Sequence, residues 1–218
     1  MWTVPISRQL NDKLAALVTE MRIEASVGGT RVVLADRASM QYGYTQTATE
    51  RPVGPKFLRI TDISSGWLDW DGVPYCPIEP KQLKKYLIHP GDVVVARTGV
   101  SAGAARYLGD NIPDAVFASF LVRIRANNPL EQTYTGLTIA STDFFEFVQA
   151  NAGGSAQPQA NPPLLGKYEY SLPANDELAV FNERVSPIIA AIEMNEREAT
   201  LLNRLQGSLL GSLVRAAD

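Results

Sequence analysis

The sequence of 218 residues has few of the side chains that most often bind metals or carry out catalysis. It contains one cysteine, Cys76, and one histidine, His89. A disulfide within the chain is therefore excluded, because it needs two cysteines, and so is a zinc site made of several Cys and His ligands. A Ser-His-Asp triad would have to use His89.

Long apolar runs are also missing. A helix that crosses a membrane needs about 18 consecutive apolar residues, and the longest runs that look buried are short, as at residues 93–96. The first 20 residues do not fit a signal peptide, because Arg8, Asp12, Lys13 and Glu20 interrupt any apolar segment. With no export signal and one cysteine, we expect a cytoplasmic protein.

Common nucleotide and metal motifs are absent: the chain has no Walker loop, no G-x-G-x-x-G and no H-E-x-x-H. Residues 99–103 are rich in glycine but lack the Lys-Ser/Thr pair of a nucleotide loop. They form either a tight turn or a loop whose backbone N–H groups, with Arg97, Thr98 and Ser101, approach a phosphate.

Residues 161–164, Asn-Pro-Pro-Leu, come close to the Asn-Pro-Pro-aromatic motif with which amino-methyltransferases hold a flipped base. Leu164 replaces the aromatic residue, and no Gly-rich S-adenosylmethionine loop precedes it, so we interpret the run as a turn. Cys76 and His89 could form a nucleophile and base, but each precedes a proline and no orienting acid is evident. We expect no catalytic residue, no metal and no cofactor in this chain.

What is present fits a folded protein. Apolar residues make up 45% and charged residues 20%. The net charge of −3 and the pI of about 5.3 argue against a nucleic-acid partner. The charge is uneven, however, because residues 51–130 carry 10 Lys and Arg against 7 Asp and Glu, whereas residues 175–218 carry 4 against 7. The basic surplus therefore lies in the middle of the chain.

Residues 1–29 are predicted to hold a helix that Ser7 caps and Gly28-Gly29 ends, with an apolar stripe of Leu10, Leu14, Leu17 or Val18, and Met21. This stripe must pack on the rest of the chain or on a partner. From residue 30 to residue 126, short β-branched and aromatic runs predict an α+β domain built on a curved, mixed sheet. Within it, residues 117–125 alternate as a half-buried strand, with Arg123 and Arg125 on its wetter side.

A further helix is predicted over residues 133–150, followed by a polar loop over 151–163. Asn175, before Asp176 and Glu177, predicts the N-cap of a long C-terminal helix that Ser186-Pro187 restarts or kinks. Beyond the proline runs a heptad seam of apolar residues with two polar interruptions: Ile188, Ile192, Asn195, Ala199, Leu202, Gln206, Leu209 and Leu213. Such a seam favours a helix that pairs with another helix over one lying on its own domain.

An ordered set of phrases carries a family resemblance. It comprises QYGYT at 41–45, FLRITDI at 57–63, GWLDW at 66–70, VPY at 73–75, LIHPGDVVVARTG at 87–99, FASFLVRIR at 117–125, GSAQP at 154–158 followed by Asn161, and SLP at 171–173. Together these phrases resemble the DNA specificity (S) subunit of type I restriction-modification systems over about residues 30–215. Residues 1–29 match nothing in that pattern, and Pro162-Pro163 departs from it.

The resemblance implies an organisation. A full S subunit holds two target recognition domains, each followed by a long helix, and the two helices pair antiparallel. This chain resembles one half: an N-terminal helix (1–29), a target recognition domain (30–173) and a dimerisation helix (174–218). The implied protein is a non-catalytic homodimer that reads a two-part, near-palindromic DNA site. It would dock the methyltransferase (M) subunits, which carry S-adenosylmethionine, and in a restriction complex the ATP- and Mg-dependent nuclease (R) subunit.

The residues themselves supply candidates for DNA contact. Lysines suit phosphates, Arg59 and Arg97 could reach guanine edges, and loop amides, phenols and hydroxyls could read bases. The expected set is Gln41, Tyr42, Tyr44, Thr45, Lys56, Arg59, Lys81, Lys84, Lys85, Arg97, Thr98, Ser101, Ser155, Gln157 and Asn161. The alternative is a recognition-like interaction module that regulates a methyltransferase without reading DNA.

Overall fold

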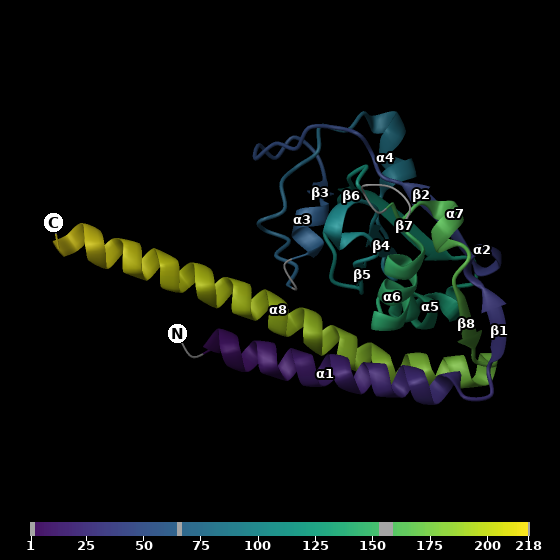
Figure 1. Cartoon of the computed structure of the whole chain (residues 1–218). Helices are drawn as coiled ribbons and strands as arrows, with labels where there is room; N and C mark the ends of the chain where they lie inside the picture. The colour runs from purple at the N-terminus through teal and green to yellow at the C-terminus, as the bar shows by residue number, and fades with distance from the viewer. Residues whose placement is uncertain (1–2, 65–66, 153–158, 218) are drawn as a thin grey trace.

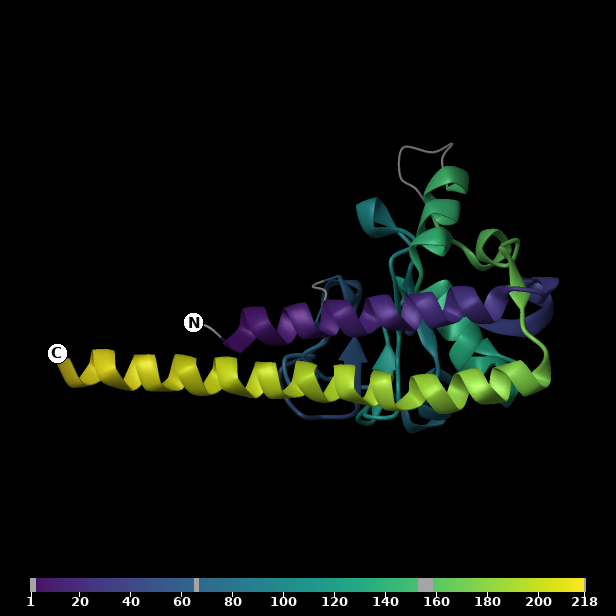
Figure 2. The same cartoon turned by 90° about the horizontal axis from the view of Figure 1, so that it is seen from below.

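Two long helices lie side by side along one side of the molecule (Figures 1 and 2). They are α1 (Thr3–Ser26) and α8 (Asn175–Ala217), in a computed structural model that describes residues 3–64, 67–152 and 159–217. The two helices run antiparallel, because Asn11 of α1 contacts Ile192 and Asn195 of α8, while the strands that follow α1 and precede α8 pair at the other end. Figure 1 shows α8 continuing past the start of α1.

The ends of the two helices differ from expectation in detail. α1 begins at Thr3, so the prediction that Ser7 caps it was wrong. α8 begins at Asn175, but its N-cap position is Ala174, whose N–H donates to the Glu177 carboxylate at 3.0 Å. The termination of α1 before Gly28 is confirmed: Gly28 has φ +80°, a conformation that glycine adopts without strain.

Pro187 does not restart α8, which runs through it without interruption for 43 residues. At about 1.5 Å per residue this gives a rod of roughly 65 Å. Proline removes one backbone donor from the helix, and burial of Val185 together with packing of Ile188 and Ile189 against the core holds the helix together across that position. A proline inside a well-packed helix is therefore tolerated here.

The body of the chain is α+β, as expected, but its strands are divided among three small open sheets in place of one curved sheet. The largest is antiparallel, in the order β2 (Ala38–Tyr42), β7 (Leu121–Ala126), β4 (Val93–Ala96), β5 (Ala105–Tyr107). β1 (Thr30–Val33) pairs antiparallel with β8 (Glu169–Leu172), and β3 (Lys56–Leu58) pairs parallel with β6 (Ala115–Phe117).

The expected single strand over residues 117–125 was wrong. β6 ends at Phe117, a turn holds Ser119 and Phe120, and β7 begins at Leu121. Both faces of β7 are packed, because Val122 and Ile124 belong to one hydrophobic cluster and Leu121 to another, and Arg123 is buried rather than on a wetter side. Packing on both faces of the sheet therefore decides burial here, against the alternation of the sequence.

Short helices cover and connect the sheets. They are α2 (Leu34–Arg37), α3 (Ile60–Ile63), α4 (Pro80–Tyr86), α5 (Gln132–Ile139), α6 (Thr142–Asn151) and α7 (Pro162–Leu165), with the 3₁₀ turns η1 (Gly99–Ser101) and η2 (Pro129–Glu131). The predicted helix over 133–150 is two helices, because Ser141 starts a new one as its N-cap. The predicted loop over 151–163 ends early, since Asn161 caps α7 by accepting from the Leu164 N–H at 3.0 Å. The Asn-Pro-Pro-Leu run is thus the start of a short helix.

The middle of α8 is tied to the body by charged groups. Glu196 pairs with Arg106, and the Glu193 carboxylate accepts from the backbone N–H of Gly109 at 2.9 Å. Arg204 binds the carboxylates of Asp69 and Asp71 at 2.9 and 2.6 Å. Burial raises the pKa of Glu196, while the Arg106 charge opposes this shift. A cavity of about 430 Å³ lies beside these contacts.

Candidate nucleic-acid interface

The ends of three strands meet at one edge of the four-stranded sheet. β2 and β4 both run antiparallel to β7, so at the start of β7 Val122 pairs with Tyr42 at the end of β2, and Leu121 pairs with Ala96 at the end of β4. The chain continues across this edge, where the Arg97 N–H donates to the carbonyl of Phe120 at 3.0 Å. The topology thus brings Tyr42, Arg97 and Phe120 together from three distant segments.

Two contacts hold the Arg97 side chain in place. Its guanidinium carbon lies 4.8 Å from the centroid of the Tyr42 ring, and Nη1 donates to the Ser119 carbonyl at 3.4 Å. A guanidinium carries five N–H donors, and a cation–π contact fixes its plane without using them. Arg97 is therefore preorganised as a donor to a phosphate or to the edge of a guanine.

Gly43 follows Tyr42 where the backbone comes closest to the neighbouring segment. A Cβ at this position would lie 2.1 Å from the carbonyl oxygen of Ala118, and its own N–H donates to the Leu121 carbonyl at 3.1 Å. The obstructing groups, the carbonyls of Ala118 and Phe117, belong to the backbone, which cannot rotate away as a side chain can. Glycine at position 43 is required to keep Tyr42 and Tyr44 at this edge.

Gly43→Ala is expected to destabilise the protein by about 1–3 kcal/mol, because the added methyl overpacks a site bounded by backbone. Urea unfolding followed by circular dichroism measures this change. Gly207→Ala is the matched control: Gly207 lies in α8, and no atom lies within 4 Å of the place that an added methyl would take, so alanine should stabilise by up to about 1 kcal/mol. Equal midpoints for the two variants would contradict the close approach at Gly43.

The lysines of α4 lie next to this edge. Lys84 and Lys85 are exposed in its last turn, and the backbone carbonyl of Lys85 accepts from the Gln41 amide at 3.0 Å. The Lys85 ammonium lies 5.3 Å from the Tyr86 ring centroid, whereas Lys81 pairs with Glu79 at 2.9 Å. Lys84 and Lys85 therefore add positive charge beside the strand that ends in Tyr42.

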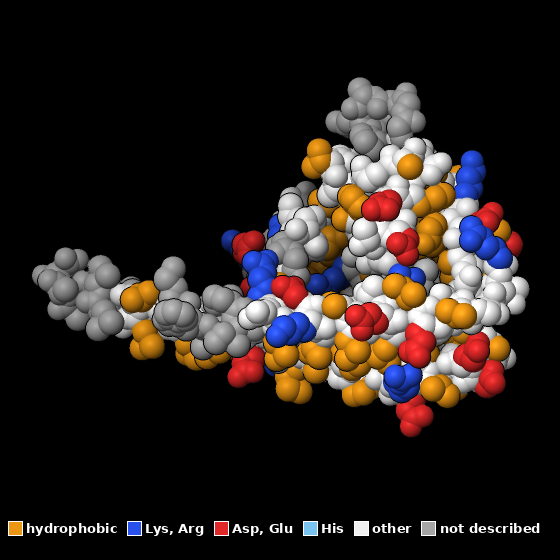
Figure 3. Space-filling view, turned by 60° about the horizontal axis from the view of Figure 1, so that its bottom comes forward, with side chains coloured by type: hydrophobic (Ala, Val, Ile, Leu, Met, Phe, Trp, Pro, Cys, Tyr) orange, Lys and Arg blue, Asp and Glu red, His pale blue; other side chains and the backbone are white. Residues whose placement is uncertain are grey.

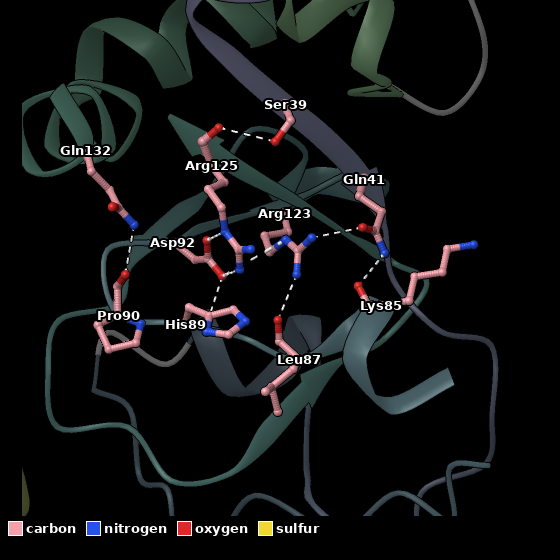
Figure 4. A network of polar contacts seen from close by, with 10 residues as sticks. All are labelled: Ser39, Gln41, Lys85, Leu87, His89, Pro90, Asp92, Arg123, Arg125 and Gln132. Atoms are coloured by element: carbon pink, nitrogen blue, oxygen red, sulfur yellow. Dashed lines mark hydrogen bonds and ion pairs between the residues drawn. The ribbon is translucent and has the colours of Figure 1, made fainter. Parts of the chain in front are cut away.

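A buried polar network centred on Asp92 extends through Gln41 to Lys85 (Figure 4). The Asp92 carboxylate is fully buried. It accepts two hydrogen bonds from the Arg125 guanidinium at 2.6 and 2.7 Å and one from the backbone N–H of His89 at 2.8 Å. Arg123 lies 4.0 Å from the same carboxylate. Burial lowers the pKa of Arg123, the nearby charge of Arg125 lowers it further, and Asp92 opposes both effects.

Gln41 links this network to α4. Its side-chain oxygen accepts from Arg123 at 2.8 Å, while its amide donates to Lys85. Arg123 also donates to the Leu87 carbonyl at 2.7 Å. The structure therefore places Gln41, a predicted base-reading residue, in a half-buried position with both ends of its amide engaged. The Gln41 side chain thus joins β2 and the Arg123 network to α4.

Two predicted cations make contacts within the body instead. Lys56 donates to the carbonyls of Asp71 and Val73 at 3.1 and 2.7 Å and lies 4.2 Å from the Tyr75 ring centroid. Arg59 forms a two-point ion pair with Asp62, which raises the pKa of Arg59 through the hydrogen bond. The charged groups of both side chains are therefore engaged by other groups of the body.

The remaining predicted contacts are dispersed. The Tyr44 ring packs 5.0 Å from that of Tyr86, Thr45 is exposed, and Thr98 pairs with Gln159 through a β-bridge. Ser101 is half-buried in η1, and Asn161 is used as the cap of α7. Ser155 and Gln157 lie outside the described residues.

The predicted dimerisation seam is divided along its length. The amides of Asn195 and Asn11 join at 2.9 Å, Asn11 also donates to the Ile192 carbonyl at 3.1 Å, and Ala199 is buried, so the first part packs within the chain. The second part, with Leu202, Gln206 and Leu209, is exposed; the Leu213 side chain lies outside the described residues. Figure 3 shows hydrophobic side chains gathered along this helix pair and its projecting end.

Cys76 is fully buried, and burial raises its pKa to about 11. A thiol with this pKa is protonated at neutral pH and is a poor nucleophile. His89 is exposed. Within residues 3–64, 67–152 and 159–217, no cluster of three or more His, Cys, Asp or Glu side chains could hold a metal ion, and no helix among them is long and apolar enough to span a membrane.

Phe120 and Val100 were missed by sequence reasoning. In the predicted strand over 117–125, Phe120 falls on the face opposite Arg123 and Arg125, which alternation makes the covered face, but it lies in a turn with 57% of its surface exposed, and Val100 in η1 is 97% exposed. The available signal was the pair of small residues Ala118-Ser119, which interrupts the apolar run. Small residues are compatible with a turn, although they do not specify one.

Comparison with known proteins gives a consistent structural match. No protein-family model matches the sequence, and no curated protein matches it. The crystal structure of the type I restriction-modification system S subunit from M. genitalium is similar with a TM-score of 0.62 at 15% identity, over 95% of this chain and 54% of that one. The HsdS subunit from Thermoanaerobacter tengcongensis gives 0.52 at 13% identity, over 95% and 54%.

This chain spans about half the length of the solved structures that it matches. The overlap takes in nearly the whole chain, including the helix pair as well as the sheets. It agrees with the resemblance carried by the sequence phrases, which extends over about residues 30–215. The chain therefore has the fold of one half of a type I restriction-modification S subunit.

Proposed function

We propose that this chain is a non-catalytic DNA specificity subunit of a type I restriction-modification system. The observation that carries the proposal is the match of 95% of the chain to about half of an S subunit. The edge with Tyr42 and Arg97, flanked by Lys84 and Lys85, supplies a surface suited to DNA. In this proposal Lys84 and Lys85 contact phosphates, and Arg97 contacts a phosphate or a base edge.

Two copies would act together. With one recognition domain per chain, a dimer joined through the projecting end of α8 would read a two-part, near-palindromic site. It would dock methyltransferase subunits, which bring S-adenosylmethionine, and, where present, the ATP-dependent nuclease subunit. The exposed leucines of α8 beyond residue 200 are the surface that supports this arrangement.

The decisive experiment is methylome sequencing of cells that express the chain with its cognate methyltransferase subunit. A bipartite, near-palindromic methylated site that depends on the chain supports the proposal. Unchanged methylation, in cells where the two proteins still co-purify, would instead favour a regulatory interaction module and overturn the specificity role.

Lys84→Ala/Lys85→Ala is expected to weaken DNA binding by the complex and to lower the slope of log K against log salt by about 2, one unit for each lost phosphate contact. Fluorescence anisotropy at several salt concentrations gives this slope. Lys13→Ala/Lys167→Ala removes the same charge from exposed positions in other parts of the chain and should leave the slope nearly unchanged. A similar fall in both double variants would mean that α4 has no special role.

A further inference from the structure

Several of the large exposed apolar side chains of the body belong to one sheet edge and the turn next to it. Among the described residues between α1 and α8, those with high exposure are Val27, Tyr42, Val53, Val100 and Phe120. Tyr42 and Phe120 meet at the sheet edge described above, and Val100 follows three residues after Arg97. Exposed apolar side chains that gather beside a fixed cation favour a contact surface, whereas single scattered ones do not.

Phe120 is held firmly even though its ring is exposed. The carbonyl of Phe120 accepts from the Arg97 N–H, and the preceding carbonyl, that of Ser119, accepts from the Arg97 guanidinium. The following residue, Leu121, is fully buried at the start of β7. The backbone of the turn is therefore anchored on both sides. Little further conformational entropy is lost from this backbone when a partner covers the ring.

The charged side chains near Phe120 indicate what kind of partner its ring contacts. Arg97 contacts the Phe120 turn, and Lys84 and Lys85 add positive charge on α4, which Gln41 joins to the neighbouring strand β2. This charge complements a polyanion better than an apolar protein groove. In the DNA major groove the apolar feature of a base edge is the 5-methyl group of thymine, and phenylalanine is among the side chains that contact it. Adenine, guanine and cytosine have no methyl group on that edge.

We propose that Phe120 is a specificity-determining residue that contacts the 5-methyl group of a thymine, next to the phosphate or base contact made by Arg97. This inference rests on the proposed DNA-reading function and specifies one base, a thymine, in the DNA site that the protein recognises. Arg97 acts in it twice, as a contact to DNA and as the residue that anchors the Phe120 turn.

Replacement of thymine by deoxyuridine tests the contact, because it removes only the methyl group. Once the methylated site is known, each thymine in a duplex is replaced in turn, and binding by the complex with the methyltransferase subunit is measured. At one position or at its symmetry mate, the wild-type chain should lose about three- to tenfold in affinity. Phe120→Ser should bind the thymine duplex more weakly and respond less than twofold to the same replacement.

Val180→Ser is the matched control, because Val180 is 54% exposed on α8, and this variant should respond to deoxyuridine as the wild type does. The inference is overturned if no thymine is sensitive, if Phe120→Ser keeps the full sensitivity, or if Phe120→Ser loses only its association with the methyltransferase subunit. A wild-type complex with no site preference would instead refute the proposed function itself, and the inference with it.

Discussion

Asp92→Ala is expected to destabilise the protein by about 3–5 kcal/mol, the largest single effect that the structure indicates. Asp92 is fully buried and accepts two hydrogen bonds from Arg125 and one from the His89 N–H. Its removal leaves the buried Arg123 and the partly buried Arg125 without an opposing charge. The cost is high because an uncompensated buried charge loses its solvation and gains no partner.

Urea unfolding followed by tryptophan fluorescence measures this loss. Glu169→Ala is the control, since Glu169 pairs with Arg31 at 3.0 Å on the surface, where an ion pair contributes at most about 1 kcal/mol. Asp92→Asn keeps the shape of the side chain and should recover only part of the stability, because the charge is still missing. If Asp92→Ala and Glu169→Ala unfold at the same urea concentration, the network does not stabilise the domain.

Leu205→Glu/Leu209→Glu is expected to convert a dimer of this chain into monomers. The two leucines are 61% and 64% exposed on the projecting end of α8. In a symmetric dimer each contributes twice, and burial of a leucine is worth at least about 1.5 kcal/mol. The loss of four such side chains would weaken dimerisation by about 6 kcal/mol, or roughly 10⁴-fold in Kd.

Sedimentation equilibrium at micromolar concentration distinguishes the two states. Val180→Glu introduces one negative charge near the start of α8, at a position with 54% exposure, and should leave the dimer intact. A wild-type chain that is already monomeric, or a double variant that remains dimeric, would remove the projecting end of α8 from the proposed interface.

Sequence periodicity predicted the long helices well and their partners poorly. The seam through Ile188, Ile192, Asn195 and Ala199 was expected to face a second copy, yet Asn195 binds Asn11 of the same chain. A heptad pattern shows which side of a helix is covered. It does not show whether the covering helix comes from residues close in sequence, from residues 184 positions away or from another molecule.

The candidate interface was recognised only in part, for a related reason. Arg97 and Lys84 were predicted from residue type, and the structure places Arg97 on the sheet edge and Lys84 beside it on α4. Gln41 was also predicted, but its amide is engaged by Arg123 and Lys85. Phe120 was assigned to the wrong environment. Availability of a polar group depends on tertiary neighbours, and those are set by strand order, which local patterns do not encode.

The pairing of the two ends of the chain has a consequence for how the protein folds. Asn11 meets Asn195 across 184 residues, and Thr30 pairs with Leu172 across the β1–β8 sheet. Contacts this distant carry a large loop-closure entropy and form slowly. During synthesis α1 leaves the ribosome long before α8 exists, so its apolar side stays uncovered until α8 has been made. Formation of the helix pair is therefore tied to the synthesis of α8.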